Sequence, residues 1–394
     1  MIETKYKQTE AGLIPCEWDI IKLGNCFEFK NGLNASKDCF GYGTPIVNYM
    51  DVYHHAALKS HHIAGLVNLS PSEIARFRVQ KGDVFFTRTS ETPEEVGFAS
   101  VLLDDVTDCV FSGFVLRARP INTKLYPEYC AYCFKTAQVR NAIIKSCSYT
   151  TRALTNGKVL SEISIPLPPL AEQKKIAKAL SDVDALINDL GELIIKKRNI
   201  KQGTMQQLLT GKRRLSESSD KWEERAIGDL VDIIKGQSLQ SKDFVVGSIP
   251  VVAGGQSYAG YHNRCNHDKP CVTISASGAY AGYVWLHEYP IFASDCSVIE
   301  GNDEVDIYFL YNLLKMKQEA IYQSQTGGAQ PHIHPKDIAP IRILIPSLPE
   351  QKAIASILID MDKEILALEA KKTKYESIKQ GMMQELLTGK IRLV

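Results

Sequence analysis

The chain lacks the features that mark membrane and secreted proteins. None of its 394 residues lies in an apolar run approaching about 18 residues, the length that a membrane-spanning helix needs. The first residues, Met1-Ile2-Glu3-Thr4-Lys5, do not resemble a secretory signal peptide. The ten cysteines follow neither a disulfide framework nor the spacing of a zinc site. We therefore expect a cytoplasmic protein with no bound metal.

The sequence also lacks the short motifs of common catalytic sites. No phosphate-binding loop is present, because Gly211-Lys212 is followed by Arg213 and the required upstream glycine is missing. Neither a GxSxG elbow nor an HExxH pair occurs. The methyltransferase motif Asn/Asp-Pro-Pro-aromatic is absent, and the glycines of 278–282 predict only a tight loop. We assign no catalytic residue, and the pattern favours a scaffold or reader over an enzyme.

Two groups of side chains could bind metal or undergo redox chemistry. Cys130 and Cys133 form a lone CxxC within a predicted helix, where packing is the simpler interpretation. The second group is a set of histidines at 54, 55, 61 and 62, with no carboxylate or cysteine at ligand spacing. We interpret the histidines as part of a solvated loop.

The net charge of +1 conceals an uneven distribution. Residues 171–215 carry 10 basic and 5 acidic side chains, a balance of +5, whereas residues 216–349 carry 10 and 16, a balance of −6. Proteins that hold DNA alone usually present a basic face to the phosphates. We expect this chain to bind DNA poorly by itself.

The strongest positive signal is an internal repeat. Residues 172–215 and 350–393 align without a gap at an offset of 178, and 24 of the 44 aligned positions are identical. Both copies contain Glu-Gln-Lys, Lys-Gln-Gly and Leu-Leu-Thr-Gly-Lys. Two copies so far apart indicate a two-fold molecule and not a solenoid.

Each copy predicts one long helix with the apolar spacing of a coiled coil. Prolines stand just before both copies, and Gly211 and Gly389 occupy the expected C-terminal caps. The interior glycines Gly203 and Gly381 predict a close contact or a kink. The seam, which we expect at the helix-pair or subunit interface, consists of Ile176, Leu180, Val183, Ile187 and Leu190, matched by Ile354, Leu358, Met361, Ile365 and Leu368.

The segments between the helices predict mixed α/β domains. Val84–Thr87 and Cys271–Ile274 predict strands, and helices are expected near 127–145 and 306–322. Trp18 is echoed by Trp222 ahead of each domain. We therefore predict an α+β chain with two domains and two long antiparallel coiled-coil helices, related by a pseudo-two-fold axis. The predicted segments are a first domain (1–169), a central helix (170–215), a second domain (216–348) and a C-terminal helix (349–394), with the connecting loop at 216–220.

These features resemble the specificity subunits of type I restriction–modification enzymes. The helix signature Pro-x-x-Glu-Gln-Lys-x-Ile-Ala is present at 169–177 and nearly so at 348–355. The segments 82–90, 273–278 with 294–295, and 327–332 are similar to strands and loops of that family's target-recognition domains. The resemblance covers essentially the whole chain.

The resemblance implies a non-catalytic reader of double-stranded DNA. Each recognition domain would contact one half of a split target. The paired helices would fix the length of the gap, the DNA between the two half-sites that is not read. The same helices would dock two modification subunits and two restriction subunits. S-adenosylmethionine, ATP and Mg²⁺ are expected on those partners and not on this chain.

Base reading needs polar side chains on loops that reach the major groove. The alternative for each candidate is a turn residue that satisfies local backbone groups. The candidates are Arg88, Thr89, Ser90, Tyr149, Thr150, Thr151 and Arg152 in the first domain, and Ser275, Ser277, Tyr280, Tyr283, Gln330 and His332 in the second.

Two further alternatives stay open. The chain could be a coiled-coil adaptor that assembles a complex without reading sequence, or an enzyme with no recognisable motif.

The first long helix carries a row of cations. The row predicts a solvated face, and the alternative is that it contacts modification subunits or DNA. It consists of Lys174, Lys175, Lys196, Lys197, Arg198 and Lys201.

Overall fold

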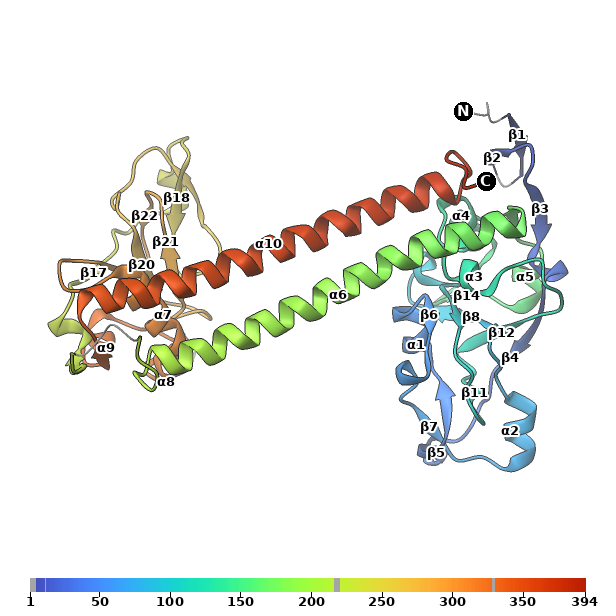
Figure 1. Cartoon of the computed structure of the whole chain (residues 1–394), viewed down its shortest axis with the longest axis horizontal. Coiled ribbons are helices and arrows are strands. Elements are labelled where there is room, and N and C mark those ends of the chain that lie inside the picture. Colours follow the sequence, from blue (N-terminus) through green and yellow to red (C-terminus); the bar gives the residue numbers. More distant parts are fainter. Residues whose placement is uncertain (1–4, 11, 216–219, 328–329) are drawn as a thin grey trace. The chain divides into compact units, whose positions relative to one another are not determined.

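The computed structural model describes residues 5–10, 12–215, 220–327 and 330–394. The chain divides into two compact units (Figure 1). Unit 1 comprises Met1–Asp189 and Lys372–Val394, and unit 2 comprises Leu190–Lys371. Most of the predicted connecting loop, residues 216–219, lies outside the described residues. Each unit is mixed α/β, as expected.

Unit 1 is built around a five-stranded sheet in the order β4-β12-β8-β10-β6. Its strands are β1 (Tyr6–Thr9), β2 (Gly12–Pro15), β3 (Asp19–Lys22), β4 (Phe27–Asn31), β5 (Phe40–Val47), β6 (Ala57–Leu58), β7 (Leu66–Val67), β8 (Val84–Thr87), β9 (Thr89–Ser90), β10 (Ala99–Leu102), β11 (Val110–Phe111), β12 (Val115–Pro120), β13 (Ser148–Tyr149), β14 (Ala153–Leu154) and β15 (Ser164–Leu167). Its short helices are α1 (Tyr49–His54), α2 (Pro71–Phe77), α3 (Pro127–Cys133), α4 (Ala137–Ser146) and α5 (Gly157–Ser161).

Unit 2 has a four-stranded sheet in the order β17-β23-β20-β21. Its strands are β16 (Glu223–Ala226), β17 (Ile233–Lys235), β18 (Ile249–Val252), β19 (Gly260–His262), β20 (Cys271–Ser275), β21 (Val284–His287), β22 (Phe292–Ala293), β23 (Cys296–Glu300) and β24 (Arg342–Ile345). Its short helices are α7 (Ile307–Met316), α8 (Gln318–Gln323) and α9 (Pro335–Ile338).

The central strands β8 and β20 confirm the two predicted strands. Every residue of both is buried, and both are rich in the β-branched and aromatic residues that favour strands. In each unit the strand lies between antiparallel neighbours, β12 and β10 around β8, and β23 and β21 around β20. In both units, therefore, a fully buried strand flanked by two antiparallel strands lies inside the main sheet.

The two predicted helices near 127–145 and 306–322 are each divided into a pair of helices. In unit 1, α4 begins after Thr136, whose side chain accepts a hydrogen bond from the amide of Val139. That N-cap starts a new helix and stops α3 from continuing. In unit 2, α7 ends at Met316 and α8 starts at Gln318. Single long helices were the wrong expectation there.

The long helices α6 (Leu170–Leu208) and α10 (Leu348–Leu386) have 39 residues each. The terminal glycines Gly211 and Gly389 have φ of 69° and 72°, the left-handed conformation of a helix cap. A Cβ added at Gly203 or Gly381 would meet nothing within 4 Å, so the expected close contact is wrong within the described chain. Among the described residues, no helix is long and apolar enough to cross a membrane.

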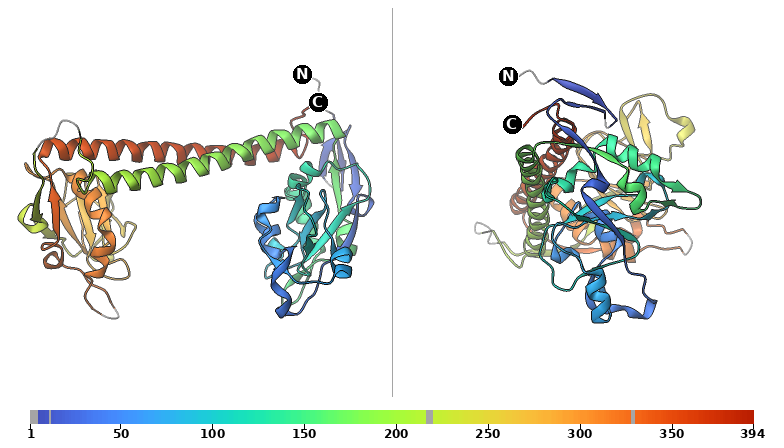
Figure 2. Two further views of the ribbon diagram at one scale, coloured as in Figure 1. Left: turned by 60° about the horizontal axis from the view of Figure 1, so that its bottom comes forward. Right: turned by 90° about the vertical axis from the view of Figure 1, so that its right-hand side faces the viewer.

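Inside each unit, portions of α6 and α10 pack together. In unit 1, Lys379 of α10 pairs with Asp184 of α6, and the C-terminal end of α10 lies beside the N-terminal half of α6 (Figure 2). In unit 2, Lys201 pairs with Asp362 at 2.5 Å, and Lys197 pairs with Glu364 at 2.6 Å. Residue numbers rise along α6 as they fall along α10, so the contacting portions are antiparallel.

The predicted seam positions are all buried or half-buried. Ile176 and Leu180 join the core of unit 1 together with Leu386. Ile354 and Leu358 join the core of unit 2. The remaining seam residues are buried at Leu190 and Ile365 and half-buried at Val183, Ile187, Met361 and Leu368. The N-terminal half of each helix thus forms one wall of a domain core, beyond any role between helices.

Candidate nucleic-acid interface

In unit 1 a small sheet brings together two predicted segments that lie 60 residues apart. Its strand order is β13-β14-β9. Thr89 of β9 lies opposite Leu154 of β14, and Tyr149 of β13 lies opposite Ala153. The segments containing Arg88 and Tyr149 therefore reach the same place, although the sequence offered no sign of their pairing.

The side chains on this small sheet differ in exposure. Tyr149 is 57% exposed, and Thr150, Thr151 and Arg152 are exposed in the turn beside it. Arg88 is half-buried, and its Nη1 donates to the carbonyl of Gly113 at 3.4 Å. The turn therefore presents polar and aromatic groups to solvent, with one guanidinium partly held at its base.

Ser90 has a different environment from its neighbours. It is buried, and its hydroxyl donates to the carboxylate of Glu95 at 3.1 Å. The Thr92 amide donates to the Ser90 hydroxyl at 3.3 Å. This geometry supports the local turn, which is the alternative that the sequence left open, and it leaves Ser90 little surface for a ligand.

In unit 2, Ser277 and His332 meet through an isolated β-bridge. The Ser277 hydroxyl donates to the Asp295 carboxylate. Tyr280 and Gln330 are exposed close to them in sequence. The structure thus gathers predicted residues from two separate segments, as it does in unit 1.

Two other candidates in unit 2 are less available. Ser275 is a buried residue of β20, and its hydroxyl has no protein partner among the described residues. Tyr283 is half-buried, with the Lys315 ammonium 4.5 Å from its ring centre. Ser275 therefore presents no surface to a ligand, and we do not carry it into the proposal below.

A buried cluster fixes the start of α6 in unit 1. The carboxylate of Glu172 accepts hydrogen bonds from Trp18 Nε1 at 2.9 Å and from Arg392 Nε at 2.7 Å and Nη2 at 2.8 Å. Burial acts to raise the pKa of Glu172, but the bonds from Arg392 and Trp18 outweigh it and hold this pKa below its usual value. The tail after α10 is thereby joined to the first domain.

Unit 2 contains the same cluster at the start of α10. The carboxylate of Glu350 accepts from Trp222 Nε1 at 3.2 Å and from Arg214 Nε and Nη2, both at 2.7 Å. Glu350 and Arg214 are the repeat equivalents of Glu172 and Arg392. The Trp–Glu–Arg cluster is therefore duplicated with its bonding pattern intact.

The glutamine of each Glu-Gln-Lys motif anchors a neighbouring loop. Gln173 Nε2 donates to the carbonyls of Lys124 and Pro168, both at 2.9 Å, and its Oε1 accepts from the Tyr126 amide at 2.9 Å. Gln351 makes the matching three bonds in unit 2, also at 2.9 Å, with Glu304, Pro346 and Asp306. The motif quoted from the sequence thus acts as a structural support.

The histidine group fits the predicted solvated loop only in part, because His54 and His61 are exposed whereas His55 and His62 pack together. The rings of His55 and His62 stack with centres 3.9 Å apart, and both residues are half-buried. Burial and the neighbouring histidines lower the pKa of His62. Within the described residues, no three His, Cys, Asp or Glu side chains are placed to hold a metal ion.

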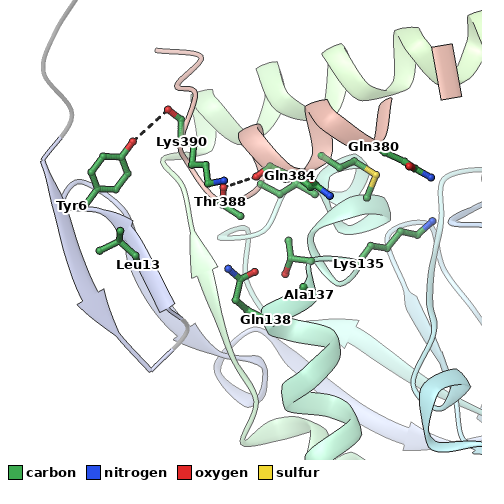
Figure 3. Close-up of a pocket in the computed structure, with 12 residues that line it drawn as sticks. Tyr6, Leu13, Lys135, Ala137, Gln138, Gln380, Gln384, Thr388 and Lys390 are labelled. Atoms are coloured by element: carbon green, nitrogen blue, oxygen red, sulfur yellow. Dashed lines mark hydrogen bonds between the residues drawn. The ribbon is translucent and has the colours of Figure 1, made fainter. Parts of the chain in front are cut away.

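Unit 1 also contains a cavity of about 820 Å³ (Figure 3). It lies between the β1–β2 hairpin, the start of α4 and the end of α10, where Tyr6 donates to the Lys390 carbonyl at 3.4 Å. Lys135 and Lys390 line it together with glutamines and apolar side chains. None of the predicted base-reading residues borders this cavity, so it is separate from the candidate interface.

Comparison with protein families assigns both halves of the chain. The profile described as "Type I restriction modification DNA specificity domain" matches residues 15–198 and again 219–380. The chain belongs to the specificity subunits of type I restriction–modification systems. It carries two specificity domains, as the duplicated Trp–Glu–Arg cluster indicates.

Other specificity subunits are similar along the chain. The putative type I restriction enzyme MjaX specificity subunit of Methanocaldococcus jannaschii is 28% identical over 418 aligned positions, covering 99% of this chain and 97% of the relative. The EcoKI specificity subunit of Escherichia coli is 26% identical over 191 positions, covering 47% and 40%. The crystal structure of the type I S subunit from M. genitalium has a TM-score of 0.64 at 18% identity, covering 94% of this chain and 96% of the other.

Sequence reasoning missed the partners of the helix motifs. The echo of Trp18 in Trp222, and of Arg214 in Arg392, was visible in the repeat. Nothing in the sequence showed that each arginine would pair with the glutamate of the opposite repeat. The solvated face predicted for the cation row on α6 is wrong for Lys197 and Lys201, which are partly covered and pair with acidic side chains of α10 in unit 2. Arg198 also pairs with Glu369 but remains exposed.

Proposed function

We propose that this specificity subunit reads a split double-stranded DNA target, one half with each domain. One observation carries the proposal: in both units, sequence-distant polar segments meet beside the central strand, at β9–β14 in unit 1 and at the Ser277–His332 bridge in unit 2. Exposed polar and aromatic side chains on such loops suit the reading of base edges, while phosphate contacts only position a protein. Arg88, Tyr149, Tyr280, Gln330 and His332 remain our candidates.

We also propose that α6 and α10 form an antiparallel coiled coil with pseudo-two-fold symmetry, which sets the gap between the half-sites. The matched ion pairs Asp184–Lys379 and Asp362–Lys201 support this proposal, since each pair is the repeat counterpart of the other. Two-fold readers need a fixed spacing between their recognition surfaces. In this proposal the segments 1–169 and 216–348 are the recognition domains.

The outer faces of the helices would bind the partners. Several large apolar side chains are exposed on them, including Ile195 at 60% and Leu366 at 63%, and such side chains often mark protein interfaces. One structural neighbour, with a TM-score of 0.54, is titled for complex assembly of the type I system. We propose docking of two modification subunits, and of two restriction subunits, in the cytoplasm. S-adenosylmethionine, ATP and Mg²⁺ would belong to these partners, and this chain would be non-catalytic.

Methylation mapping of a host genome tests the proposal. With the chain and its modification subunit present, a split adenine-methylated motif is expected, and the motif should vanish when the chain is removed. Replacing residues 1–165 with those of another specificity subunit should change one half of the motif and leave the other intact. Methylation that is independent of the chain would reject the reader and favour a coiled-coil adaptor.

The gap can be tested separately. Inserting one helical turn into both α6 and α10 should lengthen the unread gap while both half-sites stay the same. Inserting the same four residues into the exposed turn at 107–108, outside the candidate interface, is the matched control, and it should leave the gap unchanged. An unaltered gap in the helix variant would contradict the proposal that the helices set the gap length. It would leave the proposed reading of sequence intact.

A further inference from the structure

The ends of the two central strands make the same backbone hydrogen bond. In unit 1 the Arg88 amide donates to the Phe114 carbonyl at 3.0 Å, and in unit 2 the Ala276 amide donates to the Asp295 carbonyl at 3.1 Å. The register between the strands agrees with this match, because β12 pairs with β8 as β23 pairs with β20. Phe114 and Asp295 therefore occupy one equivalent position.

A second backbone bond confirms the equivalence. The Arg88 carbonyl accepts from the Thr155 amide at 3.0 Å, and the Ala276 carbonyl accepts from the Ile333 amide, also at 3.0 Å. These bonds attach the extended segment that precedes α5 in unit 1 and α9 in unit 2. Two matched bonds at each central-strand end define a shared hydrogen-bond frame, whose side chains can be compared position by position.

The side chains on this shared frame differ in chemistry. Phe114 is 62% exposed, whereas Asp295 is a half-buried carboxylate that accepts from the Ser277 hydroxyl. Beside them, Arg88 is replaced by Ala276. One frame thus presents an aromatic ring with a guanidinium, and the other presents a carboxylate with a methyl group.

Local structure does not account for either side chain. A phenylalanine with more than half of its surface in water contributes little to a core, although its backbone is bonded as in unit 2. Among the described residues, the Asp295 carboxylate accepts a side-chain hydrogen bond from the Ser277 hydroxyl alone, which leaves acceptor capacity unused. The exposed ring and the unused acceptor capacity of the carboxylate are both available to a ligand.

We propose that this position selects a base in each half-site, through Phe114 in the first domain and Asp295 in the second. The inference rests on the proposed reading of a split DNA target and names the residues that set its sequence. A carboxylate accepts a hydrogen bond from the exocyclic amino group of cytosine, whereas an aromatic ring makes apolar contact with the thymine methyl group. Phe114 would therefore favour a thymine, and Asp295 a base that donates from its amino group.

The test uses the complete complex of this chain with its modification subunit, acting on a duplex DNA library with randomised half-sites. Methylated molecules are sequenced for the unaltered chain, for Phe114→Ala and for Asp295→Asn. The matched controls are Ile121→Ala, an exposed apolar residue of unit 1, and Asp303→Asn, an exposed carboxylate of unit 2. Thermal melting of each variant establishes that it is folded.

Each variant should relax base preference at one position of one half-site by roughly tenfold, as loss of a direct base contact does. The other half-site and both controls should keep the preferences of the unaltered chain. Unchanged preferences in the two variants would overturn the inference, while the split motif itself would still support the proposed function. A uniform fall in methylation of folded variants, without a change in preference, would also overturn it. If Asp295→Asn fails to fold, Asp295→Glu is measured in its place.

Discussion

Glu172 in unit 1 and Glu350 in unit 2 have the same bonding pattern but not the same surroundings. Arg392 is 9% exposed and also pairs with Glu17 at 2.8 Å, whereas the Arg214 side chain is 30% exposed and has Glu350 as its acidic partner. Both units therefore contain the same Trp–Glu–Arg cluster at the start of a long helix. They differ in the exposure of its arginine to water, which is greater in unit 2. The duplicated parts hold the helices, and the parts that differ lie where the two domains would read different bases.

The largest difference between the units is expected on removing the arginine of the cluster. Arg392→Ala leaves the Glu172 carboxylate buried without its cation, which should lower the free energy of unfolding by about 3–5 kcal/mol. Arg214→Ala should cost less, because water can replace a more exposed guanidinium near Glu350. Urea unfolding of the purified chain measures both.

Arg342→Ala is the matched control for these two variants, since Arg342 is exposed on β24. It should change stability by no more than about 0.5 kcal/mol. If Arg392→Ala behaved like this control, the buried pair could not be what anchors the tail in unit 1. If Arg392→Ala and Arg214→Ala lowered the free energy of unfolding equally, the different exposure of the two arginines would have no effect on stability.

The capping glycines should respond unequally to the same substitution. Alanine at Gly389 or Gly211 must adopt a positive φ, which costs about 1–2 kcal/mol. At Gly389 the new Cβ would also overlap the ring of Pro15, whereas at Gly211 it would lie 3.4 Å from the Trp222 ring, an ordinary contact. We expect losses of about 3 kcal/mol for Gly389→Ala and about 1–2 kcal/mol for Gly211→Ala. Thermal unfolding would contradict this order if the two variants were equally stable.

A buried histidine should make unit 2 sensitive to mild acid. His287 takes the place that Leu102 has in unit 1, as the strand registers show. Burial lowers the pKa of His287 to about 4, below the ordinary value of about 6.5. The unfolded chain therefore takes up the proton first, so stability falls as the pH drops from about 6.5 towards 4.

Acidification from pH 6.5 to 5 should lower the stability of unit 2 by about 2 kcal/mol through His287. His287→Leu, which copies the residue of unit 1, should remove this part of the pH dependence. Hydrogen exchange at several pH values separates the amides of the two units. An unchanged pH dependence in His287→Leu would show that other groups titrate in this range.

The sequence predicted the elements that repeat but not the contacts between distant repeats. The long helices, their glycine caps and the strands Val84–Thr87 and Cys271–Ile274 follow from local pattern. The pairing of Glu172 with Arg392 does not, because 220 residues separate them and only the folded chain brings them together. Hydropathy pattern likewise gives no sign of the chain pairing between β9 and β14.

The candidate interface was predictable as segments but not as individual side chains. Loop position was visible for Tyr149 and Gln330. Burial was not, so Ser90 and Ser275 were chosen although they point into the protein. Phe114 was overlooked because a phenylalanine after a strand reads as core, and its exposure depends on a turn that only the structure places.

The smallest expected effect concerns the two helix glycines, Gly203 in unit 2 and Gly381 in unit 1. Alanine at either position would meet nothing within 4 Å, and the gain in helix propensity should stabilise the free chain by about 1 kcal/mol. If a partner's helix packs closely against these bare positions, the same substitution should weaken assembly with the modification subunit. Comparing urea unfolding of the free chain with titration of the complex separates the two effects. Stabilisation with unchanged assembly at both positions would show that no partner approaches there, whereas weaker assembly for only one variant would show that the two units dock their partners differently.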